Sequence, residues 1–532
     1  MRIWDARVYG YIDRLRSVSS RGGSIGKQVG GYGVRIRGNG FWVPLLCMSG
    51  LGACAVGPDY KKPHTWTPSA WQHEQSRVSA PESVTTSDRP DSAWWKIFHD
   101  RELSDLETRL AAQNIDVQVA MAQLARSRAQ LMIAGAERYP GLSASGSYAR
   151  SQYSTKTMQR IISRVGKGSN LLPGENLADM SGSAVIPLLD QWRDSIDATW
   201  EVDLWGRVRR QYEASKAYMD QTGEQARSVL IARQADLARD YAELRGLQEQ
   251  LRILQKSQNE AKQMLDLSSA RYHAGLVSEL DVQNARGQLE TATAQIPQME
   301  QGIRERLNAI SLLMGAVPHS LDRELEPAGQ ILPVPPKVPV GVPSELAQRR
   351  PDIRSAEAGL HAATAEVGEA MADFYPKVTI DAGFGFQSLS FRDLGFWNAR
   401  AWNVGPSITL PIFQGGRLRG QLELKKAAQK EAALEYRQTV LGAWKEVDDA
   451  LTASADEQAR RDQLAERVKT SERAWILAGE QYRHGMTTFL QVLNAERQLL
   501  SARQDFAESQ TSVATNVVRL YNALGGGWET VM

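Results

Sequence analysis

The chain contains an internal repeat, and this feature limits the possible folds more than any other. The first halves of the two copies match without a gap, and the second halves match without a gap at a shorter spacing. The matching residues include Leu124 and Leu360, Tyr139-Pro140 and Tyr375-Pro376, Gly206-Arg207 and Gly416-Arg417, Tyr272 and Tyr482, and Gly275 and Gly485. We therefore expect two copies of one structural unit.

The same alignment gives the boundaries of these copies. We place the first repeat at residues 93–326 and the second at 344–525, followed by a C-terminal tail at 526–532. A Pro-rich linker at 327–343 joins them in extended geometry. The change in spacing falls in a polar Ser/Gly-rich stretch from Ser151 to Ser183, which predicts a loop extension of the first copy rather than a further domain.

Within each copy, apolar and polar residues first alternate with a period of two, which is typical of β-strands. The pattern is strict from Ser195 to Leu204 and recurs from Trp402 to Ile412, and strands are also expected at 142–150 and 378–387. Each stretch has about ten residues, the length that a tilted strand needs to cross a bilayer. The alternative is a half-buried sheet in a soluble sandwich.

Four strands per chain cannot close a barrel, because the backbone groups at the two edges would be left unpaired in lipid. Oligomerisation would have to complete the wall. Three copies would supply twelve strands, an even number with room for a lumen.

The apolar period then becomes helical, with Leu230, Leu237, Leu244 and Leu251 recurring every seven residues. No proline interrupts 207–272 or 417–482, so each segment predicts a helix of about 100 Å at ~1.5 Å per residue. Gly275 and Gly485 predict left-handed ends for these helices. Second helices are expected to return at 280–314 and 490–524, and helices at 103–137 and 344–373 to run toward the strands. A cytosolic coiled coil is the alternative, but it leaves the amphipathic strands unexplained.

The residues before Cys54 are typical of a targeting signal, with an excess of basic residues followed by the apolar stretch Phe41–Met48. Leu51-Gly52-Ala53-Cys54 resembles a bacterial lipobox, which predicts a signal peptide with an over-long start at 1–53 and lipidation of Cys54. The lipidated mature chain would begin with an extended segment at 54–92. The alternative is a chance run of small residues before a free thiol. Ala55, rather than Asp, fits sorting to the outer membrane.

Composition excludes several classes of protein. The formal net charge of +2 becomes slightly negative without residues 1–53, which argues against nucleic acid as a partner. The only cysteines are Cys47 and Cys54, so no disulfide framework spans the chain. No metal-binding spacing, phosphate-binding loop or catalytic triad pattern is present, so we expect conduction rather than catalysis and no cofactor or metal.

Several motifs together resemble the outer-membrane factors of tripartite efflux systems of the RND type, in the TolC-like superfamily and its NodT- or OprM-like lipoprotein branch. They are Cys54–Pro63, Trp94-Trp95 with Phe98 and Asp100, Arg349–Ile353, and the two Tyr-x-x-Gly elements. The resemblance covers residues 54–532. It implies an α+β membrane protein: a homotrimer anchored in outer-membrane lipid, with a shared twelve-stranded barrel and a long periplasmic helical barrel. Its expected partners are a periplasmic adaptor and an inner-membrane transporter, and its cargo is drugs, other small toxic compounds or metal ions.

The resemblance also implies roles for the two hairpin tips. The candidate docking residues are Gly275, Leu276, Val277 and Ser278 in the first copy, and Gly485, Met486, Thr487 and Thr488 in the second. The candidate gate residues are Glu279, Asp281, Gln491 and Asn494. Some relatives place carboxylates at the positions of Gln491 and Asn494, so this gate is less acidic. The alternative for Asp281 is a carboxylate stabilised by the helix dipole.

Two other functions remain open from the sequence. A type I protein-secretion channel shares the architecture and differs in its partners. A periplasmic adaptor lipoprotein would have one hairpin flanked by small β-domains, which fits a duplicated chain less well.

Overall fold

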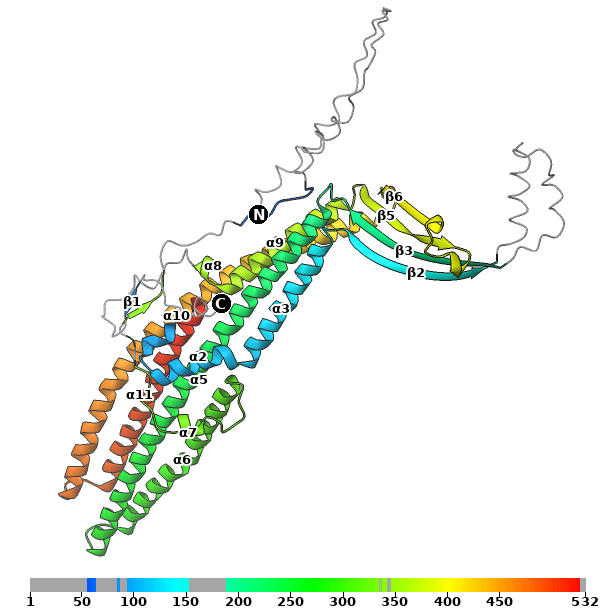
Figure 1. Ribbon diagram of the computed structural model, residues 1–532. Helices are drawn as coiled ribbons and strands as arrows, with labels where there is room; N and C mark the ends of the chain where they lie inside the picture. Colours follow the sequence, from blue (N-terminus) through cyan, green and yellow to red (C-terminus); the bar gives the residue numbers. More distant parts are fainter. Residues whose placement is uncertain are drawn as a thin grey trace, which may run out of the picture. The chain divides into compact units, whose positions relative to one another are not determined.

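The computed structural model describes residues 55–63, 84–86, 93–152, 188–333, 335, 337–341 and 346–526. Every element below belongs to the unit Cys54–Met532 (Figure 1). The expected signal peptide, Cys54 and nearly all of the loop extension lie outside the described residues.

The same order of elements occurs twice. The first copy contains α2 (Arg101–Gln113), α3 (Ile115–Ala136), β2 (Gly141–Ser151), β3 (Leu189–Glu201), α5 (Arg207–His273) and α6 (Glu279–Leu313). The second contains α8 (Leu346–Arg349), α9 (Pro351–Ala372), β5 (Lys377–Ser388), β6 (Arg400–Thr409), α10 (Arg417–Arg483) and α11 (Phe489–Ala523). Smaller elements are η4 (Trp94–Phe98), α7 (Asp322–Leu325), η7 (Phe391–Asp393), η8 (Trp397–Ala399) and the parallel pair β1 (Val84–Thr86) and β4 (Lys337–Pro339). The chain is therefore an α+β protein, as predicted.

The four long strands form one antiparallel sheet in the order β2-β3-β5-β6 (Figure 1). The copies join in its centre, where Trp200 of β3 pairs with Ile380 of β5 and Ile196 pairs with Phe384. These pairs bring the apolar positions of both copies to one face, because side chains alternate along a strand. β2 and β6 are the edges.

Two strand boundaries differ from the prediction. β3 begins at Leu189 and ends at Glu201, and β6 ends at Thr409, so the last alternating residues of both segments lie beyond the sheet. Pro411 cannot donate a ladder hydrogen bond, which helps to end β6. The indole of Trp205 donates to the carbonyl of Pro376 (2.9 Å) and marks the turn from strand to helix in the first copy.

α5 and α10 each contain 67 residues, which corresponds to about 100 Å, and their ends agree with the prediction to within one residue. α5 forms a hairpin with α6, and α10 forms one with α11 (Figure 1). The heptad leucines at 230, 237 and 244 are all fully buried. Within the described part of the chain, no helix combines the length and apolar character needed to cross a bilayer.

The helices that run toward the strands are each broken, so the prediction of continuous helices was wrong. Asn114 separates α2 from α3: its side chain accepts from the Val117 N–H (3.0 Å) and donates to the Leu313 carbonyl (2.7 Å) at the end of α6. Arg350 precedes α9 in the same way and donates to the Ala523 carbonyl (2.7 Å) at the end of α11. Helix ends leave donors and acceptors unpaired, and these breaks satisfy them between elements.

The main hydrophobic core lies near these breaks. Trp94, Trp95 and Phe98 of η4 are buried there with Leu103, Leu106 and Leu110 of α2 and with residues of α5, α10 and α11. Trp94 stacks on Tyr521 of α11 with ring centroids 5.3 Å apart. The Trp-Trp motif is therefore a packing element that joins the two copies.

Candidate functional site: the hairpin tips and their support

The two hairpin tips have the same backbone geometry. Gly275 has a φ of 70° and Gly485 a φ of 74°, so both lie in the left-handed region that favours glycine. The Gly275 N–H donates to the backbone carbonyl of Tyr272, and the Leu276 N–H donates to that of Arg271 (both 2.9 Å). These are the two hydrogen bonds of a Schellman motif. The second copy repeats both bonds, as the left-handed helix ends predicted from the sequence require.

The residues predicted to dock a partner form the turns after these caps. Leu276 and Met486 occupy equivalent positions and expose 66% and 70% of their surface. Val277 and Thr487 are half-buried, and Ser278 and Thr488 are the exposed N-caps of α6 and α11. Each tip thus presents one apolar side chain on a turn with a fixed backbone.

The four candidate gate residues lie on the first turns after these caps. Glu279 begins α6 and is exposed, whereas Asp281 is half-buried and its N–H donates to the Ser278 carbonyl (3.1 Å). Gln491 and Asn494 are exposed on α11. The structure therefore brings all four to the tip region, with the carboxylates on the first hairpin only. Among the described residues, no group of three or more potential ligands could hold a metal ion.

A contact that the sequence analysis missed joins the two tips within one chain. Arg271 donates to the Tyr482 carbonyl (2.6 Å), and its guanidinium lies 4.6 Å from the centre of the Tyr482 ring. Tyr482 is buried against Phe489, Val492 and Leu493. Tyr272, its equivalent in the first copy, is 40% exposed. Of the two equivalent tyrosines, Tyr482 therefore packs within the chain, and Tyr272 remains on its surface.

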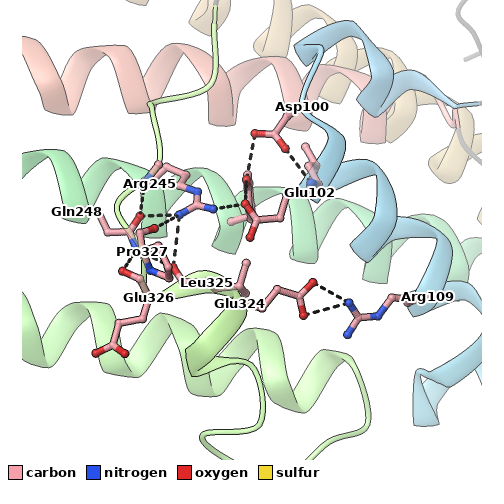
Figure 2. A network of polar contacts seen from close by, with 12 residues as sticks. Asp100, Glu102, Arg109, Arg245, Gln248, Glu324, Leu325, Glu326 and Pro327 are labelled. Atoms are coloured by element: carbon pink, nitrogen blue, oxygen red, sulfur yellow. Dashed lines mark hydrogen bonds and ion pairs between the residues drawn. The ribbon is translucent and has the colours of Figure 1, made fainter.

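The base of the first hairpin is held by a buried arginine (Figure 2). Arg245 of α5 forms an ion pair with Glu102 of α2, and it donates to Gln248 (2.8 Å) and to the Pro327 carbonyl (3.0 Å). Figure 2 shows the Leu325–Pro327 segment, which begins with the last residue of α7, beside this guanidinium. Arg245 therefore ties three segments that are distant in sequence.

Tyr241 extends the same network: its hydroxyl lies 3.0 Å from Asp100 and 3.2 Å from Glu102, and its single proton can be donated to either carboxylate. Burial raises the pKa of this tyrosine above its usual value, so the hydroxyl stays a donor at physiological pH. Arg109 of α2 pairs with Glu324 of α7 (2.8 Å) at the edge of the network (Figure 2).

The segment after Cys54 lies along the helices. Asp59 pairs with Arg210 of α5 (2.6 Å), and the Val56 N–H donates to the Trp205 carbonyl (2.9 Å). Tyr60 stacks on His361 of α9 with ring centroids 4.4 Å apart. These contacts hold Ala55 against Gly206, where strand β3 gives way to helix α5.

Comparison with known proteins identifies the family. The sequence pattern of the family described as "Outer membrane efflux protein" matches residues 107–316 and 342–526, one match for each copy of the repeat. The chain belongs to this family. The probable efflux pump outer membrane protein TtgC of Pseudomonas putida is 31% identical over 483 residues, which cover 90% of this chain and 93% of that protein. Nodulation protein T of Rhizobium leguminosarum is 29% identical over 486 residues, covering 91% and 92%.

Solved structures of the family have the same fold. The outer-membrane channel OprN superposes with a TM-score of 0.78 at 32% identity, covering 89% of this chain and all of the other. The channel CusC superposes with a TM-score of 0.75 at 25% identity over the same share of this chain and all of its own. The protein is an outer-membrane efflux channel that extends into the periplasm, as the resemblance predicted. The soluble sandwich, the cytosolic coiled coil and the adaptor are therefore not supported.

Sequence reasoning found the family and the tips of this outer membrane efflux protein but not the residues that support them. Arg245, Asn114 and Arg271 are polar residues inside helical segments or at their breaks, and no motif distinguishes them from exposed polar residues. The one available signal was a difference between the two copies. The second copy has Gln481 and Ala455 at the positions of Arg271 and Arg245.

Proposed function

We propose that three copies of this chain form a lipid-anchored exit duct. It would receive drugs, other small toxic compounds or metal ions from an inner-membrane transporter through a periplasmic adaptor, and release them outside the cell. Conduction through such a duct requires no catalytic step. Relatives are named for toluene and for cation efflux, so the cargo differs within the family.

The first support for a trimer is the sheet. In the described part of the chain, β2 and β6 each pair on one side only, which leaves two edges with unpaired backbone groups. In the repeat, β6 is the equivalent of β3, and β2 is the equivalent of β5. The pairing of β3 with β5 would therefore be repeated if β6 paired with β2 of a neighbouring chain. Thr409 would then lie opposite Ser145, and Ile408 opposite Gly146, as Thr199 and Ala198 lie opposite Asp381 and Ala382.

The observation that carries the proposal is an exposed apolar strip on α10. In the first copy, α9 packs on α5, and Ala214, Glu224 and Ile231 of α5 are at most 6% exposed. Their equivalents on α10 are Leu424, Leu434 and Leu441, which are 66%, 58% and 57% exposed. Because α3 is the equivalent of α9, the same packing between neighbouring chains would place α3 of one chain over this strip of the next.

The facing surface of α3 is apolar as well. Val119, Met132 and Ile133 are 51%, 77% and 68% exposed. The equivalents of Met132 and Ile133 on α9 are Gly368 and Glu369, which lie against Arg210 and Arg207 of α5. Apolar surfaces of this kind are typical of obligate interfaces between subunits. The strip therefore supports a permanent oligomer with the same packing between chains as within one chain.

The test is the oligomeric state of strip variants. Leu434→Glu with Leu441→Glu should place two charges in the apolar contact and convert the detergent-extracted trimer to monomer. Thr439→Glu, on another face of the same helix, should leave the trimer intact. A trimer that survives in the double variant at normal yield would contradict the proposed contact.

The proposed lipid anchor at Cys54 agrees with the place of the segment that follows it. Because Ala55 lies against Gly206 at the strand–helix junction, an acyl group on the preceding residue would start close to the bilayer surface. Adaptor contact is proposed for the two tip turns, and the role of gate for Glu279, Asp281, Gln491 and Asn494.

A further inference from the structure

A buried carboxyl group lies between the two hairpins of one chain. Glu496 of α11 is 3% exposed, and its Oε1 has no hydrogen-bond partner in the part of the chain that the structure describes. It lies two turns after Phe489, the first residue of α11, and so close to the tip. An ionised carboxylate without a hydrogen bond is costly in such a place, and such groups tend to bind a proton instead.

The charged groups around Glu496 increase this cost. Across the seam, α5 presents a second carboxylate, Glu260, whose own partners are Lys256 (4.0 Å) and Arg503 (3.5 Å). Arg503 is shared with Glu472 of α10 (2.8 Å). Arg497, the residue after Glu496, donates to Gln288 of α6 (3.2 Å). Among the described residues none of these cations forms an ion pair with Glu496, and Glu260 adds a like charge near it.

Burial, and secondly repulsion by Glu260, raises the pKa of Glu496 to about 7, and Arg497 offsets only part of this rise. The carboxyl group is therefore largely neutral in mildly acidic surroundings while the hairpins are packed. If the hairpins separated, water would reach the group and its pKa would return toward its usual value.

The first copy has no equivalent pair. Arg286 and Thr470 stand at the positions that correspond to Glu496 and Glu260. The two carboxylates are therefore not a repeated feature of this fold. The buried Tyr482 hydroxyl, which belongs to the same seam, also lacks a hydrogen-bond partner among the described residues. The seam is therefore packed with incompletely satisfied polar groups, which lowers the cost of opening it to water.

We propose that the seam between the two hairpins of one subunit is a proton-sensitive joint, in which Glu496 opposite Glu260 must be neutral for the hairpins to stay packed. This inference rests on the proposed duct for its consequence, because hairpins that separate at the tip would widen the periplasmic entrance. Acid would favour the closed entrance, and neutral to alkaline pH would favour opening.

Proton linkage gives the direction in which pH changes the stability of the packed hairpins, and the pH range of that change. The packed state binds the proton more tightly than the separated state, so the stabilisation is complete below the usual glutamate pKa of 4.5 and is lost as the pH rises to about 7. A shift of this size allows an increase of up to ~10²-fold in the equilibrium constant for opening across that window.

The experiment measures the tip distance and conductance on the full-length lipidated protein. Spin labels at Leu276→Cys and Met486→Cys report the separation of the tips, and a planar bilayer reports conductance, both from pH 4.5 to 8. We expect the distance and the open fraction of the wild type to increase with pH. Glu496→Gln, a neutral isostere, should keep the short distance throughout. Glu260→Gln should give a smaller increase that ends at lower pH.

Glu290→Gln, at an exposed position of α6 to which no gate role is assigned, is the matched control and should behave like the wild type. The tip histidines His273 and His484 remain in all variants, so a transition that they cause would persist in Glu496→Gln and would overturn the proposal. A distance that does not change with pH in the wild type would also overturn it. A distance change without any conductance would support the joint and contradict the proposed duct.

Discussion

The two copies of the repeat form the same contact at the helix break with different residues. In each copy the side chain at the helix break donates to the last carbonyl of the returning helix: Asn114 to Leu313 in the first, and Arg350 to Ala523 in the second. Only the first copy adds the buried Arg245, and Ala455 takes its place in the second. The duplication thus preserves the position of the polar contact and not its chemistry.

The largest difference between copies should appear when the arginine unique to the first is removed. Arg245→Leu would leave Glu102 without its ion pair and the Pro327 carbonyl without a donor. Because breaking a buried pair on one side leaves an uncompensated charge, we expect a loss of about 3 kcal/mol of stability. Thermal unfolding of the purified trimer would measure this loss.

A matched control is Arg252→Leu, an exposed position on the same helix that pairs with Glu249. It should change stability by less than about 1 kcal/mol. Equal melting temperatures for the two variants would mean that the Arg245 network does not hold the hairpin base.

The next prediction compares the two tips. Proline cannot adopt the positive φ of Gly485, so Gly485→Pro should destroy the cap while leaving the distant strands and core intact. We expect stable trimers in the outer membrane and loss of drug resistance in cells that depend on this channel. Gly275→Pro tests the first tip in the same way.

Asparagine tolerates left-handed backbone, so Gly485→Asn should keep most of the activity. Unchanged resistance in both proline variants would exclude the turns as docking sites. Loss in only one of them would show which hairpin the partner needs.

A smaller effect is expected at the helix breaks. Asn114→Ala removes both the N-cap of α3 and the bond to Leu313, and N-cap replacements typically cost about 1 kcal/mol. Asn114→Asp retains the cap acceptor but not the donor, so it separates the two contributions. Chemical denaturation of trimers should therefore rank the wild type above Asp and Asp above Ala, and the reverse order would contradict the double role of Asn114.

These contacts show what could be predicted from the sequence. Long helices, strands and the left-handed caps follow from local periodicity and from glycine, and most of their ends agreed to within a few residues, although β3 begins earlier than the alternating pattern. The helix breaks were missed because the apolar pattern stays helical on both sides of Asn114. The break is stabilised by the carbonyl of Leu313, which is distant in sequence. Glu496 was missed for a similar reason, since its burial depends on α5, which precedes it by more than 200 residues.

The last prediction concerns the seam at the tip and makes one copy resemble the other. Arg271 stands where the second copy has Gln481, so Arg271→Gln would remove the cation over the Tyr482 ring and leave a neutral side chain in its place. A cation–π contact of this kind contributes about 1 kcal/mol, so we expect the closed tip to open roughly fivefold more often in a planar bilayer. Arg483→Gln, at the exposed end of α10, is the control and should leave the opening frequency unchanged. Arginine side chains are not deprotonated in proteins, so the Arg271→Gln effect should be equally large at pH 5 and pH 8. An effect confined to one of these pH values would mean that the arginine and the buried carboxyl act as a single unit.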